Sequence, residues 1–167
     1  MDARFESSKM YQRILVPVDG SHTSNKALTT ALQLARDFTG QVRLIHVVDG
    51  FAGRSGFDMY GGYPGDLLEL MRENGNKILA DAMSIAQSAG VQADTVLSDN
   101  FGARLGESVV DAAKRWNADL IVIGTHGRHG IGRVLLGSGA EQIIRLAPVP
   151  VLVVRSQEHE NAAPSGT

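Results

Sequence analysis

Short apolar runs alternate with longer stretches of helical periodicity along this chain of 167 residues. The runs are rich in Val and Ile and almost continuously apolar, which is typical of strands that are covered on both faces of a sheet. They predict five strands, at residues 13–18, 42–48, 93–97, 120–123 and 151–154.

Between these runs, apolar residues recur three and four positions apart, which is the spacing of one face of a helix. We expect Ser24 to cap the first helix and Gly40 to end it, because serine favours helix starts and glycine favours helix stops. The other helices are expected at residues 66–89, at residues 105–116 and from Ser138 onward.

Strands that alternate with helices predict right-handed βαβ units and a mainly parallel sheet with helices on both faces. Five such strands fit an open, doubly wound, Rossmann-like α/β sheet, most simply in the order 3-2-1-4-5. We expect one domain over residues 1–167, with a core of about residues 13–155 and flexible ends. Strands one and four then flank the switch point, where such sheets bind ligands at the carboxyl ends of the strands.

The composition narrows the classes of function. A net charge of −2 and a pI near 6.2 argue against a general binder of nucleic acid or membranes. The chain has no cysteine, which excludes disulfides and thiolate metal sites and makes a reducing cytoplasm the default location. Residues 1–12 lack the apolar core of a signal peptide, and no apolar run is long enough to span a membrane. We therefore expect a soluble cytoplasmic protein.

A glycine-rich segment, Gly124-x2-Gly127-x9-Gly137-Ser138, follows the fourth strand and leads into the last helix. Glycines allow tight turns and expose backbone N–H groups, and a helix start adds unpaired donors and partial positive charge. The segment therefore suits an anion such as phosphate. Positive charge beside the glycines supports this interpretation, although a solvated loop whose arginines face water is the alternative; the side chains are those of His126, Arg128, His129 and Arg133.

Asp19 directly follows the first strand, so it is expected at the same switch point as the glycine-rich segment. Its carboxylate is placed to bind a ribose hydroxyl or an adenine amine, or to help hold a divalent metal such as Mg²⁺. Alternatively, its side chain forms an Asx turn with Gly20 and Ser21. At the start of the last helix, Ser138 and Glu141 have the spacing of a capping box. Such a box still leaves N–H groups of the first helical turn for a ligand.

Residues 50–65 form a second unusual segment, with six glycines and four of the nine aromatic residues of the chain. It follows the second strand, at the same edge as the switch point, and is a candidate lid over a ligand. A disordered or partner-packed loop is the alternative. No Ser-His-Asp set and no facing pair of carboxylates stands out, and His46 is interpreted as a core or rim histidine. The sequence predicts a binding site more clearly than a catalyst.

Several of these residues together resemble the universal stress protein family. They are the glycine spacing, Pro17-Val18-Asp19, His46-Val47-Val48 and the run from Pro148 to Val154. The resemblance covers roughly residues 13–155, and the glycine spacing is that of the ATP-binding branch. It implies ATP or another adenine nucleotide lying across the switch point.

The resemblance also implies individual roles. Asp19, with Pro17 and Val18 before it, would hold adenine and ribose, and Val47 would pack on the adenine ring. The ribose would be lined by Ile123 and Gly124, and the phosphate loop would open with His126 and Gly127. Phosphates would be bound by Gly137 and Ser138, helped by the backbone of Gly139 and Ala140. Independently of the resemblance, the positions of Arg128 and Arg133 in the glycine-rich segment predict that their charges act on the phosphates. Family members often carry a hydroxyl residue at the position of Ala140, which this chain lacks.

The predicted order leaves the fifth strand at the edge of the sheet, where an apolar strand is a template for pairing. The segment from Val149 to Val154 is therefore expected to pair with a second copy in a homodimer, as the resemblance also implies. The leading functional hypothesis is an adenine-nucleotide-binding sensor or switch of a stress response, with slow ATP hydrolysis at most. The alternatives are a metal-dependent hydrolase in which Asp19 holds the metal, and a scaffold that binds partners through residues 50–65.

Overall fold

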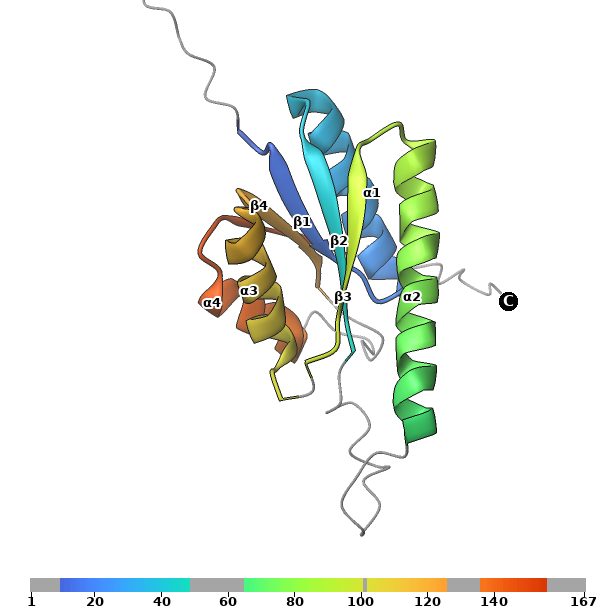
Figure 1. Ribbon diagram of the computed structural model, residues 1–167. Helices are drawn as coiled ribbons and strands as arrows, with labels where there is room; N and C mark the ends of the chain where they lie inside the picture. Colours follow the sequence, from blue (N-terminus) through green and yellow to red (C-terminus); the bar gives the residue numbers. More distant parts are fainter. Residues whose placement is uncertain (1–9, 49–64, 101, 126–135, 156–167) are drawn as a thin grey trace, which may run out of the picture.

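The computed structural model describes residues 10–48, 65–100, 102–125 and 136–155 (Figure 1). Five strands form one sheet in the order β3-β2-β1-β4-β5, and every neighbouring pair is parallel, as predicted. The strands are β1 (Arg13–Pro17), β2 (Gln41–Val47), β3 (Ala93–Ser98), β4 (Leu120–Gly124) and β5 (Val151–Val154). The helices are α1 (His22–Phe38), α2 (Gly65–Ser88), α3 (Leu105–Trp116) and α4 (Ser138–Leu146).

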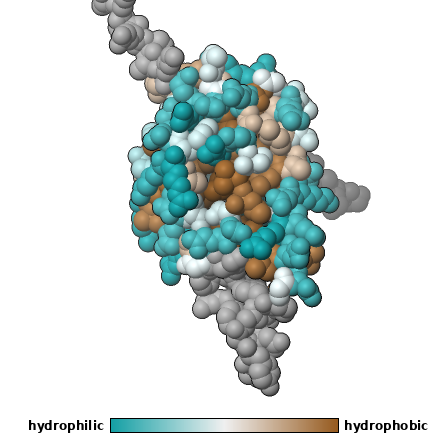
Figure 2. Space-filling view, in the orientation of Figure 1, coloured by the Kyte–Doolittle hydropathy of each residue, from teal (hydrophilic) through white to brown (hydrophobic). Residues whose placement is uncertain are grey.

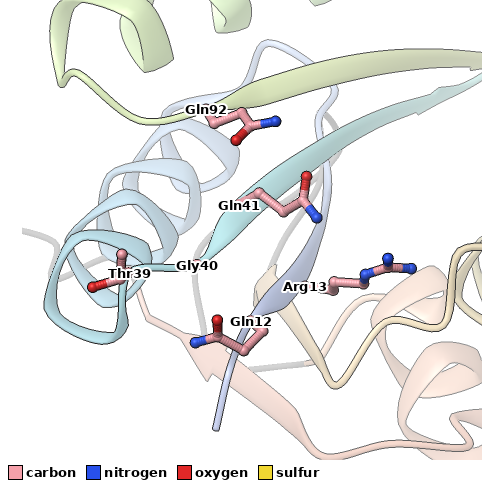
Figure 3. Close-up of a pocket in the computed structure, with 6 residues that line it drawn as sticks. All are labelled: Gln12, Arg13, Thr39, Gly40, Gln41 and Gln92. Carbon is pink, nitrogen blue, oxygen red and sulfur yellow. The ribbon is translucent and has the colours of Figure 1, made fainter. Parts of the chain in front are cut away.

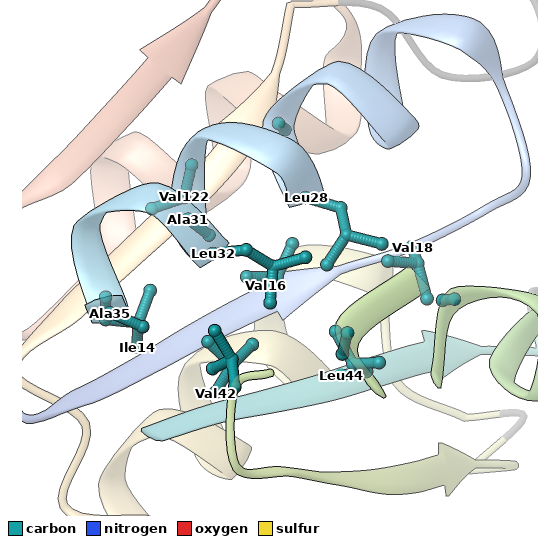
Figure 4. Packing of buried hydrophobic residues seen from close by; sticks show 14 of the residues in the cluster. Ile14, Val16, Val18, Leu28, Ala31, Leu32, Ala35, Val42, Leu44 and Val122 are labelled. Atoms are coloured by element: carbon teal, nitrogen blue, oxygen red, sulfur yellow. The ribbon is translucent and has the colours of Figure 1, made fainter. Parts of the chain in front are cut away.

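Each face of the sheet is packed by two helices, so the described chain has two apolar layers. Helices α1 and α2 cover one face, where Ala35 and Leu32 of α1 lie over Ile14 and Val16 of β1 (Figure 4). Helices α3 and α4 cover the other face, with Val109 and other buried residues of these helices against β1 and β4. The central strands β1 and β4 are covered on both faces and are apolar on both sides, which explains their continuous runs in the sequence.

The second pair of helices leaves part of its face of the sheet uncovered. Figure 2 shows apolar side chains gathered over β2 and β3, between α3 and α2. Val96 of β3 is only partly buried there. At the amino-terminal end of the same two strands, Arg43 pairs with Asp94 at 2.6 Å and lies over the ring of Trp116 at 4.7 Å.

The first helix starts earlier than predicted. Ser21, not Ser24, is the N-cap of α1, and its hydroxyl accepts a hydrogen bond from the Ser24 N–H at 3.2 Å. The two serines are three residues apart, so the second serine of the pair lies inside the first turn. At the other end, Thr39 takes the left-handed conformation, with φ of 55°, and Gly40 follows where a Cβ would collide with the carbonyl oxygen of Tyr11.

None of the helices in the described ranges is long and apolar enough to cross a membrane.

Candidate functional site

The carboxyl ends of β1 and β4 are neighbours, and the chain leaves them toward opposite faces of the sheet. After β1 it enters α1, and after β4 it reaches α4. Gly124 ends β4 against the start of α1, since a Cβ at this position would lie 2.9 Å from the carbonyl oxygen of Thr23. The structure therefore brings together the two segments that the sequence pointed to, at the switch point.

The first segment, here called the acidic arm, runs from Pro17 to Ser24. Asp19 forms the Asx turn weighed as an alternative, because its Oδ1 accepts a hydrogen bond from the Ser21 N–H at 2.9 Å. Gly20 supplies the positive φ of the turn, 78°. The Asp19 N–H donates to the Ser24 hydroxyl at 3.1 Å. The turn thus holds the carboxylate of a half-buried Asp19 at the end of β1.

The second segment, the glycine arm, consists of Gly124, Thr125 and residues 136–140. The Gly137 N–H donates to the Thr125 carbonyl at 2.9 Å, and the Thr125 N–H donates to the Val154 carbonyl at 3.0 Å. These bonds place the start of α4 beside the ends of β4 and β5. Gly137 is the N-cap of α4 and makes no side-chain capping bond. The positive end of the helix dipole, which favours anions, therefore lies at the same edge as the acidic arm.

The predicted capping box at Ser138 is absent. Ser138 is the first residue inside α4, because the bond from Gly137 to Thr125 fixes the helix start one residue earlier. Glu141 does not reach back to the cap and pairs with Arg145 at 2.6 Å. Ser138 and Glu141 therefore do not cap the helix, and the N–H groups of the first turn are left to other acceptors. These are the N–H groups of Ser138, Gly139 and Ala140.

Two further residues assigned to the nucleotide by resemblance, Val47 and Ile123, are buried at the carboxyl ends of β2 and β4. They expose 6% and 3% of their surface and belong to the core on the α3 and α4 side. Val18 is buried on the opposite face, against α1. Val18 and Ile123 thus lie at the ends of the neighbouring strands β1 and β4, and Val47 lies one strand further along, on β2. Four predicted contacts, those of His126, Gly127, Arg128 and Arg133, lie outside the described residues, as does most of the candidate lid at residues 50–65.

A shallow cavity of about 340 Å³ lies at the end of the sheet opposite the candidate site, where the strands begin (Figure 3). Its wall includes the amide side chains of Gln12, Gln41 and Gln92. The Arg13 guanidinium, its one charged group, donates to the Trp116 carbonyl at 2.7 Å. None of the predicted contact residues lines this cavity, so it does not compete with the switch point as the candidate site.

Metal ligands do not gather in the part of the chain that the structure describes. No group of three or more His, Asp or Glu side chains is found there.

Sequence reasoning missed the side chains that support Asp19. Ser24 was expected only as a helix cap, and His46 only as a core or rim histidine, yet both bond to the backbone beside Asp19. The signal for Ser24 was its spacing of five residues from Asp19. The contact of His46 depends on the pairing of β1 with β2, which no local pattern reveals.

Comparison with known proteins identifies the family. A model of the universal stress protein family matches residues 10–155. The chain belongs to this family. A universal stress protein of Methanocaldococcus jannaschii is 35% identical over 156 residues, which cover 90% of this chain and 86% of that protein.

Solved structures of the family have the same fold. A member from Burkholderia pseudomallei is 34% identical, with a TM-score of 0.70 over 88% of this chain and 98% of that chain. The universal stress protein from Archaeoglobus fulgidus in complex with dAMP is 25% identical, with a TM-score of 0.64 over 87% of this chain and 98% of that chain. The family and the order of the strands predicted from the sequence are thus confirmed.

Proposed function

We propose that this chain is an adenine-nucleotide-binding universal stress protein, of the ATP-binding branch, that acts as a sensor or switch in a stress response. The observation that carries the proposal is the meeting of the acidic arm and the glycine arm at the switch point. A carboxylate that accepts hydrogen bonds and a helix start that attracts anions are the two partners that a nucleoside phosphate needs. The relative that is described in complex with dAMP supports adenine as the base.

In this proposal the nucleotide spans the two arms. Asp19 accepts hydrogen bonds from the ribose or the adenine amine, and the buried edge at Val47 and Ile123 flanks the base and sugar. The phosphates lie at the start of α4, on the backbone N–H groups that the cap leaves to other acceptors. Ser138 adds its hydroxyl, and Arg128 and Arg133 add positive charge. Glu141 is held by Arg145, so its charge is partly balanced near the phosphates.

Mg²⁺ fits this arrangement as a companion of the phosphates. It is usually held by one or two carboxylates together with substrate oxygens and waters. Asp19 is the carboxylate we assign to it, and the phosphates supply the rest. We propose no catalytic residue, and we expect ATP hydrolysis to be slow at most.

The test is to identify small molecules released from the purified, denatured protein by mass spectrometry, and then to titrate the nucleotide-free protein with ATP, ADP and AMP by calorimetry. We expect an adenine nucleotide in the released fraction and saturable binding in the titration. Repeating the titration with EDTA tests the role of Mg²⁺ in ATP binding. No released nucleotide and no binding heat for any of the three would overturn the proposal.

We also propose that the chain forms a homodimer through β5. This strand lies at the edge of the sheet, and its Leu152 side chain is 37% exposed. Val151 and Val153 pack against the core, so a charge at either would also damage the monomer. Leu152→Lys is therefore the sharper variant, and it should give a folded monomer by light scattering and circular dichroism. A parent protein that is monomeric at micromolar concentration would remove this proposal.

A further inference from the structure

One peptide group beside the candidate site is held by side chains from two different elements. It joins Val18 to Asp19, just after β1 ends. The Val18 carbonyl lies 2.7 Å from Nδ1 of His46 on β2, and the Asp19 N–H donates to the hydroxyl of Ser24 on α1 at 3.1 Å. Because a carbonyl oxygen only accepts, Nδ1 of His46 must carry the proton in this contact.

These two bonds determine the orientation of Asp19. The Val18 N–H is already tied to the Ile45 carbonyl at 2.8 Å, so Val18 itself cannot rotate freely. With the following peptide held on both sides, the Cα of Asp19 is fixed, and its carboxylate is then set by the bond to the Ser21 N–H. A group held in this way is preorganised, which avoids the loss of conformational freedom on binding.

We propose that His46 is a positioning residue for nucleotide binding, which acts on the ligand through the Val18–Asp19 peptide without contacting it. This inference rests on the proposed function for its effect on affinity. Its structural part, the orientation of Asp19, can be tested without any nucleotide.

Helix α2 holds the imidazole in place. A Cβ at Gly75 would lie 2.7 Å from Cδ2 of His46 and 3.3 Å from its Nε2. Glycine is unfavourable within a helix, and Gly75 lies near the middle of α2. The same Cβ would lie 2.7 Å from Cδ1 of Leu97, so a side chain at this position would have to displace His46 or Leu97, which explains this glycine. The contact also links the position of α2 to the turn that carries Asp19.

The first experiment compares two substitutions of His46 by titration with AMP and ATP. His46→Asn keeps a donor near the Nδ1 position, whereas His46→Leu keeps the volume and removes the donor. One orienting hydrogen bond corresponds to a change in Kd of about tenfold, which we expect for His46→Leu and not for His46→Asn. Equal losses in the two variants would mean that His46 acts only through packing, and would overturn the inference.

Ser24→Ala tests the other side of the same peptide. The Ser24 N–H remains bonded to the Ser21 hydroxyl, so the helix cap is retained. We expect a loss of affinity similar to that of His46→Leu. The matched control is Ser84→Ala on the exposed surface of α2, where the hydroxyl bonds to the Ala80 carbonyl. Affinity unchanged by Ser24→Ala would argue against the two-sided hold on the peptide.

Nuclear magnetic resonance of the nucleotide-free protein separates this inference from the proposed function. We expect the neutral His46 ring to carry its proton on Nδ1, and His46→Leu to speed hydrogen exchange at the Ser21 amide. Should the parent protein fail to bind nucleotide, these two results would still support the role of His46 at the turn. A proton on Nε2 and an unchanged Ser21 amide would overturn it, whatever the protein binds.

Discussion

The two arms of the candidate site are built in different ways. In the acidic arm each of three bonds involves a side chain: the Asp19 carboxylate accepts from the Ser21 N–H, the Ser24 hydroxyl accepts from the Asp19 N–H, and His46 donates to the Val18 carbonyl. In the glycine arm two backbone bonds, from Gly137 to Thr125 and from Thr125 to Val154, place the start of α4. The difference matches the ligand we propose: a carboxylate must be aimed, whereas phosphate binds to N–H groups that the backbone already presents.

Two glycines of the glycine arm, Gly124 and Gly137, also differ from each other, and this difference gives the largest expected effect. A Cβ at Gly124 would meet the backbone of Thr23 at 2.9 Å, which cannot move without shifting α1. We expect Gly124→Val to lower the free energy of unfolding by about 3 kcal/mol, as for an overpacked core position. Thermal unfolding of the nucleotide-free protein measures this. A melting temperature within a degree of the parent's would show that α1 does not press on β4.

Gly137→Val should separate binding from stability. The φ of Gly137 is −60°, and its nearest neighbour to a Cβ, the Thr125 carbonyl, is 3.5 Å away. The fold therefore has room for a side chain, and we expect a change in stability below about 1 kcal/mol. Binding of ATP should be abolished, because the side chain would stand where phosphate approaches the helix start. We expect the same of Gly127→Val. If both variants bind ATP as tightly as the parent, the phosphate-loop assignment is wrong.

Two substitutions of Asp19 test whether its carboxylate binds the nucleotide through its charge or only forms the Asx turn. Asparagine also forms Asx turns, so Asp19→Asn should preserve the bond to the Ser21 N–H while removing the charge. Alanine removes both. A hydrogen bond to a charged group contributes about 1.5–3 kcal/mol, so we expect Asp19→Asn to weaken binding by at least tenfold. Calorimetry with AMP measures the loss, and full affinity in Asp19→Asn would assign this residue to the turn alone.

The smallest effects should come from Arg128 and Arg133, which we expect to act through charge. Changing either to Gln should weaken binding of ATP more than binding of AMP, with a loss that shrinks as salt rises. Titrations at two salt concentrations provide the measurement. Equal losses for the two nucleotides would mean that the arginines do not act on the outer phosphates.

The sheet was predictable because strands such as β1, β4 and β5 are short apolar runs between helical segments. Residues 151–154, for example, match β5 as observed, and the alternation of strands and helices leads to the order of the strands. Helix starts were less predictable. Ser21 and Ser24 are equally good caps by residue type, and the choice depends on where the chain leaves β1. At α4 the start depends on the bond from Gly137 to Thr125, which joins residues that are far apart in sequence.

In the candidate site, too, the features that depend on local sequence were predictable and those that depend on tertiary contacts were not. Asp19 and the glycine arm were predictable because each comes directly after a strand and the topology brings them together. The role of His46 was not predictable, since it depends on the register of β1 against β2 and on the close approach of Gly75. A histidine in a strand carries no local signal of either contact. Supporting residues of this kind are fixed by tertiary neighbours, and only the structure identifies them.

The bond between Thr125 and Gly137 has a consequence for how this protein can change over evolution or by engineering. It ties the start of α4 to the end of β4 through backbone atoms, so this junction does not depend on which side chains stand at positions 126–135. Lengthening a flexible segment whose ends are joined costs only about 0.6 kcal/mol for each doubling of its length. We therefore expect insertions between Thr125 and Leu136 to change ligand binding, through Arg128 and Arg133, more than they change the stability of the sheet.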